Sequence, residues 1–140
     1  MAETLDRMTG RPNSRTILIV EDDEVLRMVL RVEFEKNGFN VREAENGSAG
    51  LTSIVEMHPD AIITDIEMPV MNGFSFIAEV RKADGQADIP IIAISASKIT
   101  DVAAKAVAAG ANQFCEKPLT TKNILAVINA YLPPDASPAN

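Results

Sequence analysis

The 140-residue sequence has a single cysteine and no long apolar run. The lone Cys115 excludes both an intrachain disulfide framework and a cysteine-rich zinc site. A membrane-spanning helix needs about 18 consecutive apolar residues, and no segment approaches this length. Residues 1–7 lack the basic and apolar regions of a secretory signal. These absences predict a cytoplasmic protein that does not enter membranes.

Basic residues are also too few to form a dominant positive face. Lys and Arg number 13 against 20 Asp and Glu, which gives a net charge of -7. Nucleic acids and anionic membranes attract basic faces, so we expect neither as a partner. The length suits one domain of ~100–200 residues. We interpret residues 15–132 as that domain, residues 1–14 as a flexible leader and residues 133–140 as a flexible tail.

Short apolar runs alternate with segments of helical periodicity along this domain. Strands are expected at residues 16–20, 39–44, 61–64, 89–94 and 113–115. A helix follows each strand, around residues 26–34, 47–58, 76–80, 100–109 and 120–131, the last with Thr120 as its N-cap. Continuous apolar strands between amphipathic helices indicate a parallel sheet covered on both faces. The pattern predicts an α/β fold, a doubly wound five-stranded parallel sheet with five helices.

Polar side chains stand where four of these strands end. They are Glu21, Asp22, Asp65, Ser95 and Lys117. The carboxyl ends of parallel strands meet at one edge of the sheet, so these groups should converge there. Carboxylates this close resist ionisation unless a cation lies between them, and hard oxygen ligands suit Mg²⁺. A different interpretation is that the acidic run after the first strand only stabilises a helix N-terminus.

Such an edge can carry phosphoryl chemistry. The Asp65 carboxylate can attack phosphorus and hold it as an acyl phosphate. Mg²⁺ would neutralise one phosphoryl oxygen and Lys117 another, while the Ser95 hydroxyl and neighbouring backbone N–H groups bind the third. No general base is needed, because the attacking carboxylate is already ionised.

Four motifs carry a family resemblance. They are ILIVEDDE at residues 17–24, ITDIEMPVMNG at 63–73, AISA at 93–96 and EKPL at 116–119. In this order they resemble the receiver domain of bacterial two-component response regulators, of the single-domain type, over about residues 15–132. The resemblance implies a flavodoxin-like (CheY-like) three-layer sandwich.

The resemblance also implies a metal site. Asp65 would be the phosphoacceptor. Asp22 and Asp65 would bind Mg²⁺ through their side chains, and Glu67 through its backbone carbonyl. Glu21 would complete the acidic pair and act through a water molecule. Mn²⁺ is the alternative ion.

Other positions match the family's phosphate-binding and switch residues. Ser95 would fill the Ser/Thr switch position, with the Ala96 backbone beside it. Lys117 would fill the invariant lysine position, and Phe114 the aromatic switch position. In the family mechanism, phosphorylation draws the hydroxyl inward and the aromatic ring turns into the vacated space.

Two further positions would influence the lifetime of the acyl phosphate. Glu67 stands two residues after Asp65, and Ser97 stands two residues after Ser95. A glutamate at this place either repels phosphate or reaches toward Lys117. The sequence does not decide between these effects, so it predicts no lifetime.

The resulting hypothesis is a stand-alone response regulator that receives phosphate from a sensor histidine kinase or a histidine phosphotransfer protein. It would catalyse its own phosphorylation and dephosphorylation without turning over a small-molecule substrate. Its output would be binding to a downstream target protein or onward phosphotransfer, as a monomer or weak dimer. One alternative is a small aspartyl-phosphate hydrolase of haloacid-dehalogenase type, which the spacing of Asp65 and Glu67 loosely resembles. Another is an interaction module that is never phosphorylated.

Overall fold

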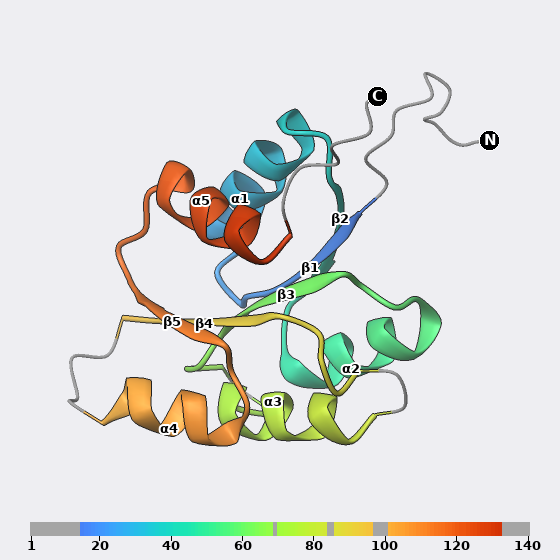
Figure 1. Cartoon of the computed structure of the whole chain (residues 1–140), viewed down its shortest axis with the longest axis vertical. Helices are drawn as coiled ribbons and strands as arrows, with labels where there is room; N and C mark the ends of the chain where they lie inside the picture. The colour runs from blue at the N-terminus through green and yellow to red at the C-terminus, as the bar shows by residue number, and fades with distance from the viewer. Residues whose placement is uncertain (1–14, 69, 84–85, 97–100, 133–140) are drawn as a thin grey trace.

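The computed structural model describes residues 15–68, 70–83, 86–96 and 101–132. Over these residues, strands and helices alternate as predicted (Figure 1). The strands are β1 (Thr16–Val20), β2 (Asn40–Ala44), β3 (Ala61–Asp65), β4 (Ile91–Ser95) and β5 (Gln113–Glu116). The helices are α1 (Glu24–Lys36), α2 (Gly47–Glu56), α3 (Gly73–Lys82), α4 (Val102–Ala109) and α5 (Thr121–Tyr131). The leader at 1–14 and the tail at 133–140 lie outside the described residues.

The five strands form one parallel sheet in the order β2-β1-β3-β4-β5. Val20 at the end of β1 is paired with Thr64, the residue before Asp65 in β3. Asp65 in turn is paired with Ile94, the residue before Ser95 in β4. This register brings the ends of the three central strands to one level. The predicted doubly wound sheet is confirmed.

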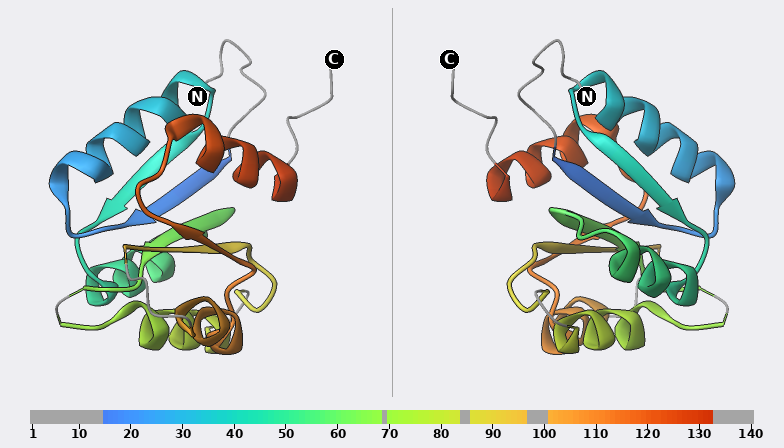
Figure 2. Two further views of the ribbon diagram at one scale, coloured as in Figure 1. Left: turned by 90° about the vertical axis from the view of Figure 1, so that its left-hand side faces the viewer. Right: turned by 90° about the vertical axis from the view of Figure 1, so that its right-hand side faces the viewer.

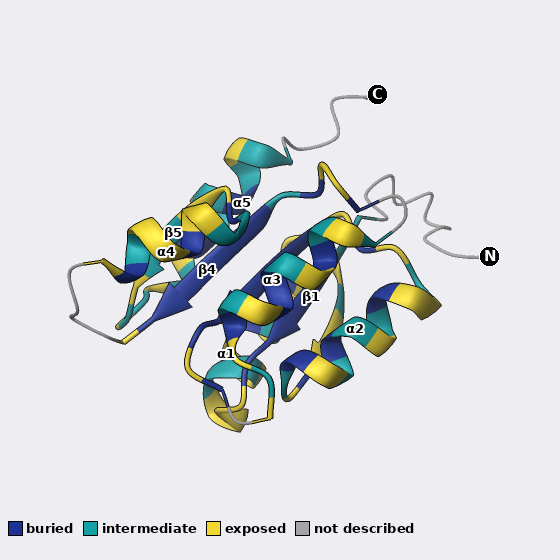
Figure 3. Ribbon diagram, turned by 90° about the horizontal axis from the view of Figure 1, so that it is seen from below, coloured by how far each residue is buried: buried dark blue, intermediate teal, exposed yellow. Residues whose placement is uncertain are grey.

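Helices cover both faces of the sheet. Helices α1 and α5 lie on one face, and α2, α3 and α4 lie on the other (Figures 1 and 2). In β1, Ile17 and Ile19 join the core beneath α1 and α5, whereas Leu18 and Val20 join the core beneath the other helices. This alternation is that of a strand buried on both sides. Figure 3 shows the buried strands β1 and β4 behind the helices that cover this face of the sheet.

Side-chain caps begin four of the helices. Asp23 accepts hydrogen bonds from the backbone N–H groups at the start of α1, and Asn46 does so for α2. Asn72 caps α3, and Thr120 caps α5 by accepting from Asn123 N at 3.1 Å. The predicted Thr120 cap is confirmed. Each cap satisfies backbone donors that have no partner within the helix.

Two strands begin later than predicted, and β3, β4 and β5 each end one residue later than predicted, at Asp65, Ser95 and Glu116. The expected strand at 89–94 begins at Ile91, although Ile89 is buried and the Pro90 carbonyl accepts from Ile62 N at 2.9 Å. Phe39 lies outside β2, since its N–H donates to the Phe34 carbonyl at 3.1 Å in the turn that ends α1. Both residues are buried and apolar, so hydrophobicity alone does not distinguish them from strand residues. The expected helix at 100–109 begins at Val102 in the structure, and residue 100 lies outside the described ranges.

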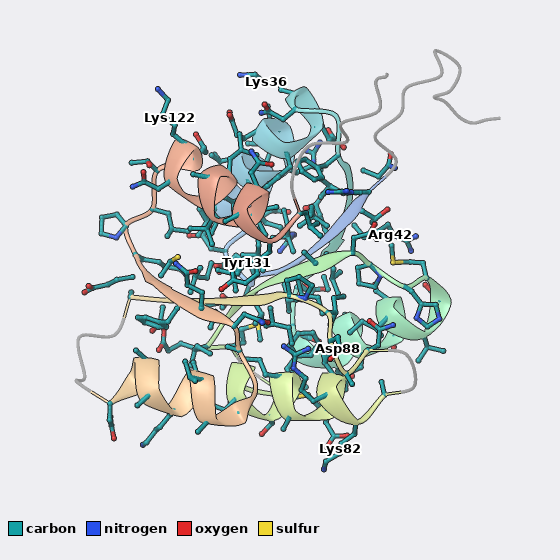
Figure 4. The ribbon with its side chains drawn as sticks, viewed as in Figure 1. Lys36, Arg42, Lys82, Asp88, Lys122 and Tyr131 are labelled. Carbon is teal, nitrogen blue, oxygen red and sulfur yellow. The ribbon has the colours of Figure 1, made fainter. Side chains whose placement is uncertain are left out.

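Charged side chains near the ends of several helices project from the surface. Figure 4 shows Lys36, Lys82 and Lys122 projecting outward from α1, α3 and α5. Among the described residues, no helix combines the length and the apolar character that crossing a membrane would require.

Candidate functional site

The predicted site residues meet at the carboxyl edge of the sheet. Glu21 and Asp22 follow β1, and Asp65 ends β3. Ser95 ends the neighbouring strand β4, and Lys117 follows β5. The backbone N–H of Lys117 donates to the Ser95 carbonyl at 2.8 Å. This bond links the end of β4 to the segment that follows β5. The sheet therefore assembles in space what the sequence distributes over nearly 100 residues.

Three carboxylates form the centre of this edge. Glu21, Asp22 and Asp65 each offer an oxygen, and these oxygens all lie within 4.8 Å of one another. Glu21 has no exposed surface and Asp65 is 2% exposed, whereas Asp22 is exposed. An ion could therefore enter from the solvent side past Asp22. This set of hard oxygen donors, open on one side, fits Mg²⁺, which keeps several of its waters.

Lys117 provides positive charge beside the carboxylates. Its Nζ lies 3.0 Å from Glu21 Oε1 and 3.4 Å from Asp65 Oδ2. One lysine thus faces both buried acids. Since two buried negative charges share one positive charge, the pocket keeps an excess of negative charge, which a divalent cation would offset.

The pKa values reflect this imbalance. Burial raises the pKa of Glu21 to about 7, although the Asp23 N–H and Lys117 oppose the shift. Burial also raises the pKa of Asp65, against the effect of Lys117 and with a further contribution from the negative charge of Glu67. For Lys117, burial lowers the pKa, but its two acidic neighbours outweigh burial and leave the pKa raised. The lysine is therefore held in its charged form.

Glu67 makes a contact that the sequence did not predict. Its backbone N–H donates to Asp65 Oδ1 at 3.3 Å. Its carboxylate Oε2 accepts a hydrogen bond of 2.5 Å from the Ser95 hydroxyl. The sequence left open whether Glu67 repels phosphate or reaches toward Lys117. The observed bond to Ser95 joins the residue two places after Asp65 to the predicted switch residue.

The remaining predicted residues lie around this centre. Ala96 is exposed and lines an open pocket together with Lys117 and the residues Asp23, Leu26, Pro118 and Leu119. Phe114 is half-buried and packs against the core beneath α2, α3 and α4. Ser97 lies outside the described residues.

Asp23 belongs to the acidic run but has a different task. Its Oδ1 accepts from the N–H groups of Val25 and Leu26 at 3.0 and 3.2 Å. The interpretation of the run as a helix N-terminal feature therefore applies to Asp23, while Glu21 and Asp22 belong to the carboxylate cluster.

Sequence reasoning missed two residues that position the site. Arg27 NH1 donates to the Glu21 carbonyl at 2.6 Å, and Arg27 Nε to Glu43 Oε1 at 2.9 Å. Gly73 packs so closely on β3 that a Cβ there would lie 2.4 Å from the Asp65 carbonyl oxygen. The sequence does not reveal these contacts, because the carbonyls of Glu21 and Asp65 are main-chain atoms without a sequence signature and Glu43 lies on a different strand.

The parallel sheet and the acidic cluster with its lysine define an α/β protein whose carboxyl edge carries a group of carboxylates that could hold a metal ion. The family model for the response regulator receiver domain matches residues 17–129, and the chain belongs to this family. The resemblance carried by the four motifs is confirmed, as is the CheY-like fold. Receiver domains are signalling modules of two-component systems that work with histidine kinases and downstream targets and bind Mg²⁺ in an acidic pocket.

Individual relatives agree with this assignment. Chemotaxis protein CheY of Bacillus subtilis (strain 168) is 38% identical over 117 residues, covering 83% of this chain and 96% of that protein. Transcriptional regulatory protein PrrA of Mycobacterium tuberculosis is 33% identical over 124 residues, which are 89% of this chain and 52% of the regulator. This chain thus spans about half the length of the regulator. The receiver domain of sensor histidine kinase PA1611 from Pseudomonas aeruginosa PAO1, solved with a magnesium ion coordinated in its active site cleft, superposes with a TM-score of 0.79 at 26% identity, covering 86% of this chain and 98% of that one.

Proposed function

We propose that this chain accepts a phosphoryl group from a phosphohistidine donor on Asp65. The observation that carries the proposal is the position of the Asp65 carboxylate. Asp65 lies 3.4 Å from the Lys117 Nζ and within 4.8 Å of Glu21 and Asp22. A nucleophile, a cation site and a fixed positive charge therefore meet at one point, as phosphoryl transfer requires.

In the proposed step, a carboxylate oxygen of Asp65 attacks phosphorus. The bond from phosphorus to the donor's imidazole nitrogen breaks, and the imidazole keeps the electron pair. Lys117 favours the ionised carboxylate and neutralises a phosphoryl oxygen. The Ser95 hydroxyl and the Ala96 N–H would bind the third phosphoryl oxygen, the first two being neutralised by Mg²⁺ and Lys117.

The metal ligands in this proposal are the side chains of Asp22 and Asp65 and the Glu67 carbonyl, with Glu21 acting through water. When bound, Mg²⁺ neutralises charge on a phosphoryl oxygen; Mn²⁺ is the alternative ion. The cluster of three carboxylate oxygens within 4.8 Å supports this assignment.

The output follows from changes at Ser95 and Phe114. A phosphoryl group on the acceptor would draw the Ser95 hydroxyl toward it, and Phe114 would repack against the core that it already contacts. The altered surface would span α4, β5 and α5 and bind a downstream target, or the phosphate would pass onward to a histidine. Ser97 and Glu67 would set the phosphoryl lifetime. We propose a cytoplasmic chain, monomeric or weakly dimeric, without nucleic-acid or membrane partners.

Helix α1 offers a docking surface for the donor. Val25, Met28, Val29 and Val32 are 66%, 47%, 41% and 46% exposed and recur at helical spacing. Helix α1 begins directly after the acidic residues, so a protein that places a phosphohistidine over Asp65 must pass close to it. Exposed apolar residues beside a reactive group are typical of an interaction surface.

Changing the middle of this surface separates docking from chemistry. We expect Val29→Asp to lower phosphotransfer from any histidine kinase that labels the wild type by about tenfold or more, because a charge would be buried at the contact. Labelling by a small phosphodonor should be unaffected. Val55→Asp, at an 80% exposed position on α2, is the matched control. Equal transfer to wild type and Val29→Asp would exclude α1 as the docking surface.

The proposed function itself is tested with acetyl phosphate and Mg²⁺, followed by intact mass. We expect one added phosphoryl group on the wild type, none on Asp65→Asn, and little labelling without Mg²⁺. Equal labelling of both proteins would contradict the assignment of Asp65.

The same reaction distinguishes the two alternatives. Sustained hydrolysis of a chromogenic phosphate ester over many turnovers would indicate a hydrolase of haloacid-dehalogenase type. A wild type that accepts no phosphoryl group with Mg²⁺ present would indicate an interaction module that is never phosphorylated.

A further inference from the structure

The hydrogen bond between Ser95 and Glu67 joins a buried donor to an exposed acceptor. Ser95 has no exposed surface, and its strand lies beside β3. Glu67 is exposed in the loop after β3, and its Oε2 lies 2.5 Å from the Ser95 Oγ. The Glu67 N–H holds the same loop to Asp65 Oδ1 at 3.3 Å. The carboxylate therefore extends from the loop that follows the proposed acceptor to the proposed switch residue.

A phosphoryl group on Asp65 would need the same donor. A serine hydroxyl has one proton to donate. Phosphoryl oxygens are anionic acceptors, and so are the oxygens of the Glu67 carboxylate. The two anions would also repel each other at this distance. Both therefore cannot hold the Ser95 hydroxyl at once.

The two partners differ in their freedom to move. Ser95 is fixed in β4, where the register pairs it with Glu116 of β5. Glu67 is exposed, so its side chain can turn into water and regain hydration there. When the two anions compete, Glu67 is the one that leaves.

We propose that the Glu67 carboxylate is a built-in placeholder for the phosphoryl group, which holds the Ser95 hydroxyl in the unphosphorylated protein and must release it before phosphate can bind. This inference rests on the proposed function. Glu67 acts here as a positioning residue through Ser95. It raises the threshold for forming the phosphorylated state, because every phosphoryl group must first displace an internal anion.

The test measures the affinity of beryllofluoride, a phosphoryl analogue, with Mg²⁺ present by isothermal titration calorimetry. We expect Glu67→Ala to bind it about tenfold more tightly than the wild type, because the competing charged hydrogen bond is gone. Glu67→Gln keeps an acceptor but loses the charge and should lie between the two. The matched control, Glu45→Ala, removes the same charge from an exposed position after β2, two strands away from β3, and should bind like the wild type.

The Ser95 hydroxyl is tested by repeating the change in a second background. In Ser95→Ala, the gain from Glu67→Ala should shrink to about twofold, since only charge repulsion remains. Ser95→Thr keeps a hydroxyl and should retain the full gain. A second reading needs no metal or analogue: in chelator-treated protein, Glu67→Ala should shift the Ser95 amide resonance, and Glu45→Ala should not.

Three outcomes would overturn the placeholder. One is unchanged or weaker analogue binding by Glu67→Ala, and another is an equal gain with and without the Ser95 hydroxyl. Either result, combined with normal labelling of Asp65 by acetyl phosphate, rejects the placeholder and leaves the proposed function intact. If neither acetyl phosphate nor beryllofluoride reacts with the wild type or any variant, the proposed function and this inference both fail.

Discussion

Glu21 shows how a single residue depends on its surroundings. Its carboxylate has no exposed surface, and a buried charge is costly unless it is paired. One oxygen accepts from the Asp23 N–H at 2.9 Å and the other lies 3.0 Å from Lys117 Nζ. Burial still dominates, and it raises the pKa of Glu21 to about 7.

This shift predicts a pH-dependent stability of the metal-free protein. The folded pKa of about 7 lies above the ordinary value of 4.5, so the folded state binds more protons between these values. The stability that this extra proton on Glu21 contributes is fully present below pH 4.5 and is lost as the pH rises through about 7. We expect the free energy of unfolding, from urea titrations with chelator, to fall by up to about 3 kcal/mol between about pH 5 and pH 8. Glu21→Gln should flatten much of this dependence; a wild-type curve with no fall in this range would contradict the shifted pKa.

Gly73 predicts a steric effect on the acceptor strand. A Cβ at this position would lie 2.4 Å from the Asp65 carbonyl oxygen and 2.6 Å from Ile66 Cα, both main-chain atoms that cannot turn away. We expect Gly73→Ala to lower the free energy of unfolding by about 2–4 kcal/mol in urea. Ser75→Ala, exposed on the same helix, should change it by less than about 0.5 kcal/mol. Equal stability of the two variants would show that the main chain at Asp65 and Ile66 can move to make room for the added methyl group.

At the scale of elements, Arg81 connects α3 to the segments around α4 and β4. Its Nε and NH2 donate to the Gly110 carbonyl at 3.0 and 2.7 Å, and NH1 donates to the Ile89 carbonyl at 2.6 Å. NH2 also donates to Asn112 Oδ1 at 2.8 Å, which accepts from Ile91 N as well. One guanidinium thus joins the end of α4 to the start of β4.

Removing this guanidinium should cost stability. We expect Arg81→Met, which keeps the apolar stem, to lower the free energy of unfolding by about 2–4 kcal/mol, because main-chain acceptors lose their donors. The neighbouring Lys82, whose side chain is 73% exposed, provides the control Lys82→Met, with a change below about 0.5 kcal/mol. A loss no larger for Arg81→Met than for the control, in urea titrations at neutral pH, would contradict the role of these bonds.

Local patterns predicted the elements better than the bonds between them. The Thr120 cap could be expected because a cap acts on residues next to it in the chain. The Arg81 bonds could not, since they reach the carbonyl of Gly110, 29 residues away, and carbonyls carry no sequence signature. The predicted start of β4 at Ile89 is two residues too early, because Ile89 is apolar and buried like a strand residue but precedes the strand.

At the scale of the molecule, the excess of acid acquires a location. The chain carries a net charge of -7, and part of the negative charge is concentrated in the Glu21, Asp22 and Asp65 cluster. A cation that binds this cluster binds only the folded state, because the three carboxylates meet only after the sheet has formed. It must therefore stabilise the whole domain.

Metal binding should be visible in the overall stability. At Mg²⁺ about 100-fold above its dissociation constant, we expect the free energy of unfolding to rise by about 2.7 kcal/mol. Asp22→Asn removes a proposed ligand at an exposed position and should abolish this gain while leaving the metal-free protein folded. Glu45→Gln should keep the full gain. Stabilisation of Asp22→Asn by Mg²⁺ to the wild-type extent would exclude Asp22 as a ligand.

The fold, and the edge of the sheet at which the site lies, could be predicted from the sequence alone. Apolar periodicity identifies strands and helices, and parallel strands bring their carboxyl ends together, so Asp65 and Lys117 could be placed in advance. The contacts of each polar side chain could not be predicted in this way and are seen in the folded structure. It turned Asp23 into a helix cap and directed Glu67 to Ser95. The reason is physical: burial follows from pattern, but the direction of a side chain depends on neighbours that distant strands and helices supply.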